Sequence, residues 1–264
     1  MARPIVTLTT DYGTNDHLVG AMKGVILSIN PEINIVDITH SVLAHDLLDG
    51  ALAIGQAYKY FPPKTVHVVV VDPGVGTARR PILVASDTHY FVAPDNGVLS
   101  SVYDQTEALY VWNIISEHYF RQPVSNTFHG RDIFAPVAAW LTKSWQSGAF
   151  GEPIEDFVRF ALPKPKTNGN VVKGVVLKVD QFGNLITNLR KEDVPAFAAE
   201  GGKFTIKAGN ATMNKLVPTF ASGANGEAIG LIGSSGYLEI SVNKASASKS
   251  LALGRGAEVT VEVE

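Results

Sequence analysis

The amino-acid sequence predicts two parts: an N-terminal α/β domain, with a mostly parallel sheet flanked by helices, and an all-β C-terminal antiparallel barrel. Three observations support this fold class. In the first part, short β-branched apolar runs alternate with amphipathic segments, as in sheets that are buried on both faces. After residue 170, only short strand-like runs follow, at regular spacing. A stretch rich in Pro and Gly, 160–170, separates the two patterns.

The first domain begins with a strand and a helix. Residues 4–10 are short and β-branched, which indicates a buried strand that ends at Asp11. The segment 16–31 carries apolar residues at helical spacing and stops at Pro31. The other elements predicted here are strands at 33–39 and 66–71, a hairpin from 81–86 and 89–94, and helices at 45–62 (with Asp46 near its start) and 130–145 (with Pro136 in its first turn).

The second domain is predicted from its short runs of alternating apolar residues. These runs are 171–180, 185–190, 203–208, 227–233, 237–242 and 257–264. The expected boundaries are therefore 1–163 for the α/β domain, 164–170 for a linker and 171–264 for the barrel.

Composition excludes several classes of protein. The chain of 264 residues has a net charge of −3 and no long Lys/Arg run, so nucleic acid is not an expected partner. It has no cysteine, which excludes disulfides and thiolate metal sites and suits a reducing compartment. No apolar run approaches the roughly 18 residues of a membrane span. We therefore expect a cytoplasmic protein with no membrane contact. His40 and His45 match no common metal-ligand spacing, so we also expect no metal site.

Carboxylates follow two of the predicted strands. Asp11 and Asp72 would lie at the carboxyl ends of parallel strands, where open α/β sheets bind ligands. Asp11 is equally well explained as a helix cap or turn residue. After Asp72, the turn "PGVG" leads back to Arg79, which could instead be a surface charge.

Other motifs exclude two kinds of nucleotide site. "PGVG" lacks the Gly-Lys-Ser/Thr of a phosphate loop, and "TTDYGTND" lacks the G-x-G-x-x-G of dinucleotide binding. His129 precedes a glycine and a predicted helix, so its imidazole could point into a cleft. In the second part, "VDQFGNLITN" (179–188) and "GSSGYLEISVN" (233–243) carry polar residues around glycines, and both are also explained as hairpin turns.

Five motifs in order resemble one family. "TTDYG", "VVDPGVGTARR", "FHGRD", "DQFGNLITN" and "GSSGYLEI" are similar to the S-adenosyl-L-methionine (SAM) hydroxide adenosyltransferases, which are related to the fluorinase and chlorinase. The resemblance implies attack of water or hydroxide on the ribose C5′ of SAM, giving adenosine and L-methionine. It implies no cofactor, since SAM is the substrate. It also implies a homotrimer whose sites lie between the N-terminal domain of one subunit and the C-terminal domain of the next.

The resemblance also assigns residues to roles. Asp72, Arg79 and His129 match the catalytic Asp-Arg-His set, and Asp11 matches the carboxylate that holds the ribose hydroxyls. The residues expected to contact substrate are Asp11, Phe128, Asp180, Phe182, Asn184, Ser234, Tyr237, Glu239 and Val242.

The resemblance assigns these residues to different parts of SAM. Asp180 and Ser234 are expected at the amino-acid part, and Phe182 is expected to stack. Asn184 is expected to reach the base. The closing "YLEISVN", which differs from the halogenases, is expected to place Glu239 and Val242 at the adenine end.

Two other functions are weighed against hydrolysis. The halogenating relatives carry a tyrosine where this chain has Asp72, a halide-holding serine where it has Gly130, and an inserted loop that is absent here, so halogenation is disfavoured. The other alternative is a SAM- or adenosine-binding protein without turnover, in which Asp72 and Arg79 form a structural ion pair. For hydrolysis, a sulfonium leaves as a neutral thioether and needs no acid or metal. We expect Asp72 and Arg79 to position water and His129 to relay or accept its proton.

Overall fold

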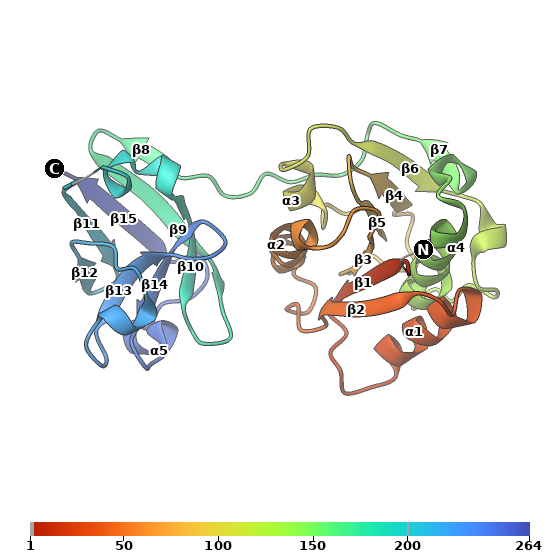
Figure 1. The fold of residues 1–264 in the computed structure, drawn as a ribbon, viewed down its shortest axis with the longest axis horizontal. Helices are drawn as coiled ribbons and strands as arrows, with labels where there is room; N and C mark the ends of the chain where they lie inside the picture. Colours follow the sequence, from red (N-terminus) through yellow and green to blue (C-terminus); the bar gives the residue numbers. More distant parts are fainter. Residues whose placement is uncertain (1–2, 200) are drawn as a thin grey trace. The chain divides into compact units, whose positions relative to one another are not determined.

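The structure, a computed structural model, describes residues 3–199 and 201–264 and divides into two compact units (Figure 1). The first unit is Met1–Leu162 and the second is Pro163–Glu264. Within the segment 164–170, expected to be a linker, Lys166–Asn168 form strand β8, which pairs with β9 of the second unit.

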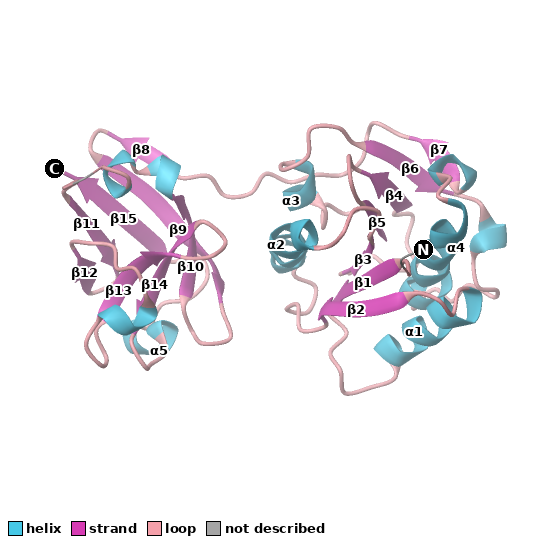
Figure 2. Ribbon diagram, viewed as in Figure 1, coloured by secondary structure: helices cyan, strands magenta, loops and turns pink. Residues whose placement is uncertain are grey.

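The first unit combines helices with a seven-stranded sheet (Figure 2). Its strands are β1 (Ile5–Thr10), β2 (Asn34–Thr39), β3 (Val66–Val70), β4 (Pro81–Ala85), β5 (Tyr90–Pro94), β6 (Tyr110–Ile114) and β7 (Gly151–Pro153). Its α-helices are α1 (Leu18–Ile29), α2 (Leu47–Ala57), α3 (Ser100–Tyr103) and α4 (Ala135–Ser144), and a π-helical turn, Gly130–Phe134, leads into α4.

The sheet of the first unit is mixed, which corrects the expectation of a mostly parallel sheet. Its strand order is β2-β1-β3-β5-β4-β6-β7. The pairs β1–β2, β1–β3 and β3–β5 are parallel, whereas β4–β5, β4–β6 and β6–β7 are antiparallel. The predicted hairpin of β4 and β5 is confirmed and reverses the chain without a helical crossover, so the strands beyond it run antiparallel. Strands β6 and β7 and helix α3 have weak sequence patterns and were not predicted.

Helices cover both faces of this sheet. Helices α1 and α4 lie on one face and α2 and α3 on the other (Figure 1). Strand β3 shows the alternation: Val68 and Val70 pack into the core with α1 and α4, and Val69 packs into the core with α2 and α3. Burial on both faces explains why β3 is an unbroken apolar run.

Two predicted helix starts are confirmed. Asp46 is the N-cap of α2, and its side chain accepts a hydrogen bond of 3.0 Å from the backbone N–H of Asp49. Pro136 lies in the first turn of α4, where a missing N–H costs nothing.

The second unit is an eight-stranded antiparallel sheet that is nearly barrel-shaped, as predicted. Strands β12, β11, β15, β9, β10, β14 and β13 follow in this order, and β8 pairs with β9. A bridge between Leu216, just after β12, and Gly230 of β13 brings the two ends of the sheet together. Besides β8, the elements are β9 (Val171–Val179), β10 (Leu185–Arg190), β11 (Phe204–Ala208), β12 (Ala211–Met213), β13 (Ala228–Ile232), β14 (Tyr237–Val242), β15 (Glu258–Val263) and helix α5 (Ala247–Leu251).

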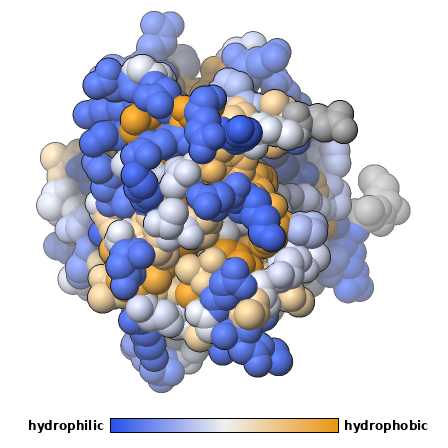
Figure 3. Space-filling model, turned by 90° about the vertical axis from the view of Figure 1, so that its left-hand side faces the viewer, coloured by the Kyte–Doolittle hydropathy of each residue, from blue (hydrophilic) through white to orange (hydrophobic). Residues whose placement is uncertain are grey.

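The surface of the second unit carries apolar side chains among polar ones. Figure 3 shows the face at the left-hand end of Figure 1, where hydrophobic residues gather between hydrophilic ones. Among the described residues of this unit, the large apolar side chains classed as exposed are Phe182 and Phe220.

The helices of the described residues are short. The longest, α1, has 12 residues, and none combines the length and apolar character that a bilayer crossing requires.

A buried histidine makes the stability of the first unit depend on pH. The ring of His67 is fully buried, contacts the Thr7 hydroxyl at 2.7 Å and packs against Phe91. Burial, reinforced by His89, lowers the pKa of His67 to about 3. Above the unfolded pKa of ~6.5 the ring is neutral in both states. As pH falls below that value, only the unfolded state takes up the proton, so the folded state loses stability.

His67 contributes about 2 kcal/mol to the decrease in the free energy of unfolding between pH 7 and pH 5. We therefore predict that His67→Gln makes this decrease smaller by about that amount. Denaturant titrations followed by tryptophan fluorescence measure this, because Trp112, Trp140 and Trp145 all lie in the first unit. His17→Gln, at an exposed histidine, is the control. An unchanged slope in His67→Gln would contradict the prediction.

Candidate active site

Asp72 lies at the edge of the sheet where the parallel strands end. Strands β1 and β3 pair in register as far as Thr10 and Val70. Asp11 comes directly after β1 and Asp72 two residues after the end of β3, so both leave the sheet at the same edge. The side chain of Asp72 is only 4% exposed. A buried carboxylate requires a partner, and the chain supplies one seven residues later.

Arg79 holds Asp72 with a fork of hydrogen bonds. Its Nε donates to Oδ1 and Oδ2 of Asp72 at 3.0 and 2.9 Å, and its Nη2 donates to Oδ2. The guanidinium is 9% exposed and stacks over the ring of Phe134, 5.2 Å from the ring centroid. This planar pairing is specific to arginine and fixes the carboxylate in orientation.

The loop between the two residues turns tightly. The backbone N–H of Val75 donates to the carbonyl of Asp72, and that of Thr77 donates to Gly74. Gly76 has φ +77°, and a Cβ there would overlap the backbone carbonyl of Asn126. Glycine is therefore required for this turn to lie against the segment that precedes His129.

His129 completes the cluster. Its Nδ1 lies 2.7 Å from Nη2 of Arg79. Because a guanidinium can only donate, Nδ1 accepts, and the proton of the neutral ring is on Nε2. Burial first and the Arg79 charge second lower the pKa of His129. The ring is therefore neutral near pH 7, with Nε2–H as a free donor. The lone pair of Nδ1 is engaged by Arg79 in this arrangement.

One donor of the cluster has no partner. The Nη1 of Arg79 is buried and makes no hydrogen bond with any described residue. Buried polar groups are almost always hydrogen-bonded, so this N–H group is suited to an acceptor on a ligand or water.

Tyr12 and Phe128 form the wall beside the cluster. Their rings meet edge to face with centroids 5.9 Å apart, and Phe128 is buried in the core with α1 and α4. Burial, with Asp11 and Asp72 nearby, raises the pKa of the Tyr12 hydroxyl. Tyr12 therefore remains a neutral hydrogen-bonding group at this edge.

Asp11 is tied to a neighbouring loop. Its Oδ2 accepts a hydrogen bond of 2.9 Å from the backbone N–H of His45. Its other oxygen, Oδ1, accepts no hydrogen bond from the described residues. Both expectations for Asp11, loop anchor and ligand contact, are compatible with this geometry.

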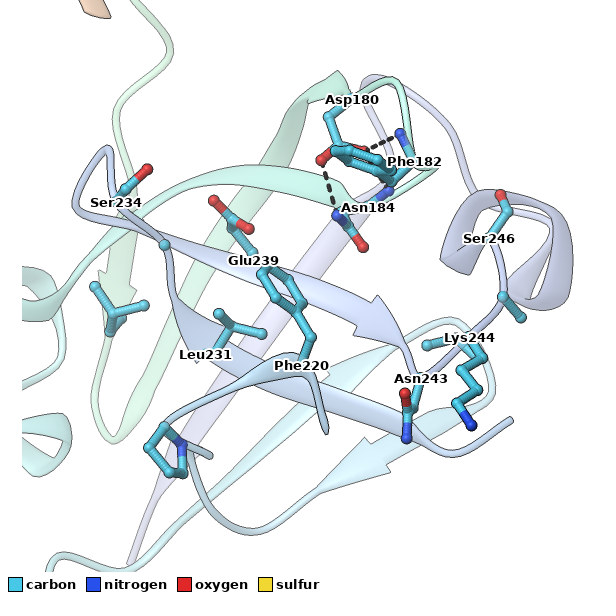
Figure 4. A pocket seen from close by; sticks show the side chains of 15 residues that line it. Asp180, Phe182, Asn184, Phe220, Leu231, Ser234, Glu239, Asn243, Lys244 and Ser246 are labelled. Atoms are coloured by element: carbon cyan, nitrogen blue, oxygen red, sulfur yellow. Dashed lines mark hydrogen bonds between the residues drawn. The ribbon is translucent and has the colours of Figure 1, made fainter. Parts of the chain in front are cut away.

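The second unit holds a cavity of about 930 Å³. It is lined by Asp180, Phe182, Asn184, Pro218, Phe220, Leu231, Ile232, Gly233, Ser234, Glu239, Val242, Asn243, Lys244, Ala245 and Ser246 (Figure 4). Six residues of the sequence-based set, Asp180, Phe182, Asn184, Ser234, Glu239 and Val242, are thus brought together. Such a mixture of apolar walls and few polar groups is typical of small-molecule sites.

Tyr237 lies outside this lining. Its hydroxyl accepts a hydrogen bond of 2.8 Å from Arg190, whose guanidinium also stacks over the ring. Its backbone carbonyl accepts from the N–H of Gly233, which closes the turn 233–236. Tyr237 therefore supports the turn that carries Ser234, and in this unit it faces Arg190 instead of the cavity.

Several lining residues had no sequence signal. Phe220 lies in a loop without a motif, and Lys244 follows the last motif at φ +59°. Phe182 and Phe220 are 79% and 48% exposed, and both line the cavity. Exposed aromatic rings at a cavity are typical of ligand contacts, and Phe220 is presented by the short 3-10 turn Phe220–Ser222.

Comparison with known proteins identifies the family. The profile of the SAM hydroxide adenosyltransferase N-terminal domain matches residues 6–151, and that of the C-terminal domain matches residues 174–260. The chain belongs to the SAM hydroxide adenosyltransferase family. This confirms the family inferred from the five motifs.

Individual relatives are similar over almost their whole length. A (R)-S-adenosyl-L-methionine hydrolase of Methanocaldococcus jannaschii is 37% identical over 94% of this chain and 91% of the relative. A fluorinase of Actinoplanes sp. is 31% identical over 98% of this chain and 97% of the relative. A crystal structure of a conserved protein from Thermotoga maritima superposes with a TM-score of 0.90 at 36% identity, covering 97% of this chain and 99% of that one.

Within the SAM hydroxide adenosyltransferase fold of this chain, a residue larger than Gly130 would require the side chain of Tyr12 to shift. A Cβ there would lie 2.6 Å from the hydroxyl of Tyr12 and 3.3 Å from Sδ of Met22. Tyr12 thus occupies the space that a serine side chain would need. Among the described residues, no group of three or more His, Cys, Asp or Glu side chains is arranged to hold a metal ion.

The cluster predicts opposite shifts in the pKa of His129. Arg79→Gln removes the charge that disfavours an imidazolium, so it should raise this pKa. Asp72→Asn removes the charge that favours one, so it should lower this pKa further. Histidine NMR titrations of each variant measure both values. Arg159→Gln, at an exposed arginine of the same unit, should leave the pKa unchanged. Shifts of the same sign in the two variants would contradict this geometry.

Proposed function

We propose that this chain hydrolyses SAM to adenosine and L-methionine by attack of water on the ribose C5′. The Asp72–Arg79–His129 cluster carries the proposal, because it joins a carboxylate, a free N–H donor and a neutral imidazole at the ligand-binding edge of the sheet. The family supports it, since a relative 37% identical is named a SAM hydrolase.

The reaction requires activation of the attacking water and not protonation of the leaving group. The sulfonium leaves as a neutral thioether, so no proton donor or further cofactor is proposed and SAM is the substrate. Free water has a pKa near ~15.7 and an ordinary carboxylic acid ~3.9. Full deprotonation before attack would therefore cost about 16 kcal/mol. The carboxylate instead positions the water and receives its proton late, when bond formation has made that water acidic.

The three side chains then have separate tasks. Asp72 accepts a hydrogen bond from the attacking water and takes its proton. Arg79 fixes the Asp72 carboxylate and offers Nη1 to an oxygen of water or substrate. His129 accepts from Arg79 through Nδ1 and donates through Nε2. This assignment replaces the sequence-based idea that His129 receives the proton.

The substrate-binding residues are also proposals. Asp11 would hold the ribose hydroxyls through its free Oδ1, with Tyr12 and Phe128 forming the wall beside it. In the second unit, Phe182 would stack on the base and Asn184 would bind its edge. Ser234 would meet the amino-acid part, while Val242 supplies an apolar contact at the adenine end.

Halogenation is disfavoured although fluorinases are among the relatives. Position 130 holds glycine instead of a halide-holding serine, and a serine there would displace the hydroxyl of Tyr12. Asp72 brings a negative charge to the place where an anion would have to bind, and like charges repel.

Assembly and location rest on the resemblance and on composition. We propose a homotrimer, which sedimentation equilibrium would test. We also propose a cytoplasmic location, because the chain has no cysteine.

Product analysis tests the reaction itself. Purified protein incubated with SAM in ¹⁸O-water should give methionine and adenosine with the label in the 5′-hydroxyl, detected by mass spectrometry. The same products should form with or without chloride. Intact SAM would favour a binding protein without turnover, and a 5′-chlorinated nucleoside would favour a halogenase.

Two variants separate the roles of Asp72 and His129. Asp72→Asn should lower kcat by about 10²–10⁴-fold, because the late proton acceptor is lost. His129→Asn keeps one acceptor and one donor but cannot take a proton, so it should lose less activity than Asp72→Asn. Asp156→Asn, at an exposed carboxylate, is the control. If His129→Asn were as inactive as Asp72→Asn, His129 would be the proton acceptor after all.

A further inference from the structure

The cavity of the second unit has two chemically different ends. Asp180 lies beside the ring of Phe182 (Figure 4). The carboxylate of Glu239 lies on the side of Ser234, while Asn243 and Lys244 lie on the other side. The rings of Phe182 and Phe220 lie between them. A ligand bound here therefore meets negative charge at one end and a positive charge at the other.

Asp180 is already engaged by its own turn. Its Oδ1 accepts from the backbone N–H groups of Phe182 and Asn184 at 2.9 and 2.8 Å. Its Oδ2 accepts from Nδ2 of Asn184 at 2.8 Å. Three donors thus hold this carboxylate, which fixes the turn and the aromatic ring on it. Its expected contact with the amino-acid part has to compete with these bonds.

Glu239 is the carboxylate without a partner. It lies on β14, is 8% exposed, and neither accepts a hydrogen bond nor pairs with a cation among the described residues. Burial, with Asp180 nearby, raises the pKa of Glu239. The turn 233–236 packs closely over it, since a Cβ on Gly233 would overlap the Glu239 carboxyl. A carboxylate held in this way, with one side open to a cavity, is suited to a cation.

We propose that Glu239 binds the α-ammonium group of the amino-acid end of the substrate, an inference that rests on the proposed function. In SAM, the Cα atom that carries both the ammonium and the carboxylate lies three bonds from the sulfonium sulfur. With the ammonium at Glu239, Ser234 and the backbone of turn 233–236 can receive the neighbouring carboxylate. This moves Glu239 from the expected adenine end to the amino-acid end. The flat base is left to the rings of Phe182 and Phe220.

The assignment makes Glu239 a specificity residue for ligands with a free ammonium. Truncating one partner of a buried charge pair weakens binding strongly. The affinity for adenosine, which lacks the amino acid, should be unchanged by a substitution at Glu239. S-adenosyl-L-homocysteine carries the same amino-acid end on a neutral thioether and gives a binding measurement that does not depend on turnover.

Isothermal titration calorimetry of the full chain tests the inference. Glu239→Gln should bind S-adenosyl-L-homocysteine at least about 10-fold more weakly than the wild type, with unchanged adenosine affinity. Glu258→Gln, at an exposed glutamate of the same unit, should bind both ligands like the wild type. Deaminated S-adenosylhomocysteine, tested on the unaltered protein, should bind as weakly as the parent ligand binds to Glu239→Gln.

Other outcomes overturn it. Equal losses for adenosine and S-adenosyl-L-homocysteine would place Glu239 at the base or in the fold. Unchanged affinity for both, or a wild type that binds the deaminated ligand as tightly as the parent, would also exclude an ammonium contact. A wild type that binds S-adenosyl-L-homocysteine but leaves SAM intact would refute the hydrolase and not the role of Glu239.

Discussion

The guanidinium of Arg79 is the group on which the candidate site of the first unit depends. It binds Asp72 through a fork, contacts His129 and stacks over Phe134. Each partner comes from a different element: the end of β3, the residue before the π-helical turn, and that turn itself. One planar cation thus sets the orientation of the carboxylate and the tautomer of the imidazole together.

Such a buried cluster is hard to explain by stability alone. Two charges taken out of water lose hydration that their attraction only partly returns, so apolar residues often stabilise a core as well or better. Asp132 shows the structural use of a buried carboxylate: Arg131, Arg121 and the N–H of Ser125 satisfy it, and these bonds lower its pKa despite burial. Arg79, by contrast, has no partner for Nη1 among the described residues. That difference favours a ligand at Arg79 and a purely structural role at Asp132.

In the second unit, the hydrogen bonds of two turns decide how the carboxylates at the cavity are used. Tight turns at 180–184 and 233–236 lie over one end of a nearly closed barrel and frame its cavity. The turn at 180–184 uses Asp180 as its internal acceptor, and Gly183, at φ +85°, packs against Ser246. Asp180 is therefore engaged by its own turn, whereas Glu239 has no hydrogen-bond or ion-pair partner among the described residues.

The sequence by itself determined the division into an α/β part and an antiparallel all-β part, the hairpin of β4 and β5 and the family, because these depend on local patterns and on motifs that are contiguous along the chain. It also named Asp72, Arg79 and His129 of the first unit and six of the residues that line the cavity of the second unit, since these lie in short motifs along the chain. Tertiary structure decided what those residues do. The mixed sheet arises from β6 and β7, whose pairing is set by long-range contacts and not by their own short patterns. The protonation pattern of His129, the blocked space at Gly130 and the lack of a partner at Glu239 depend on atoms that are distant in sequence. The spacing of residues along the chain does not predict such contacts, because the hydrogen-bond partners of a buried group depend on how distant segments pack together.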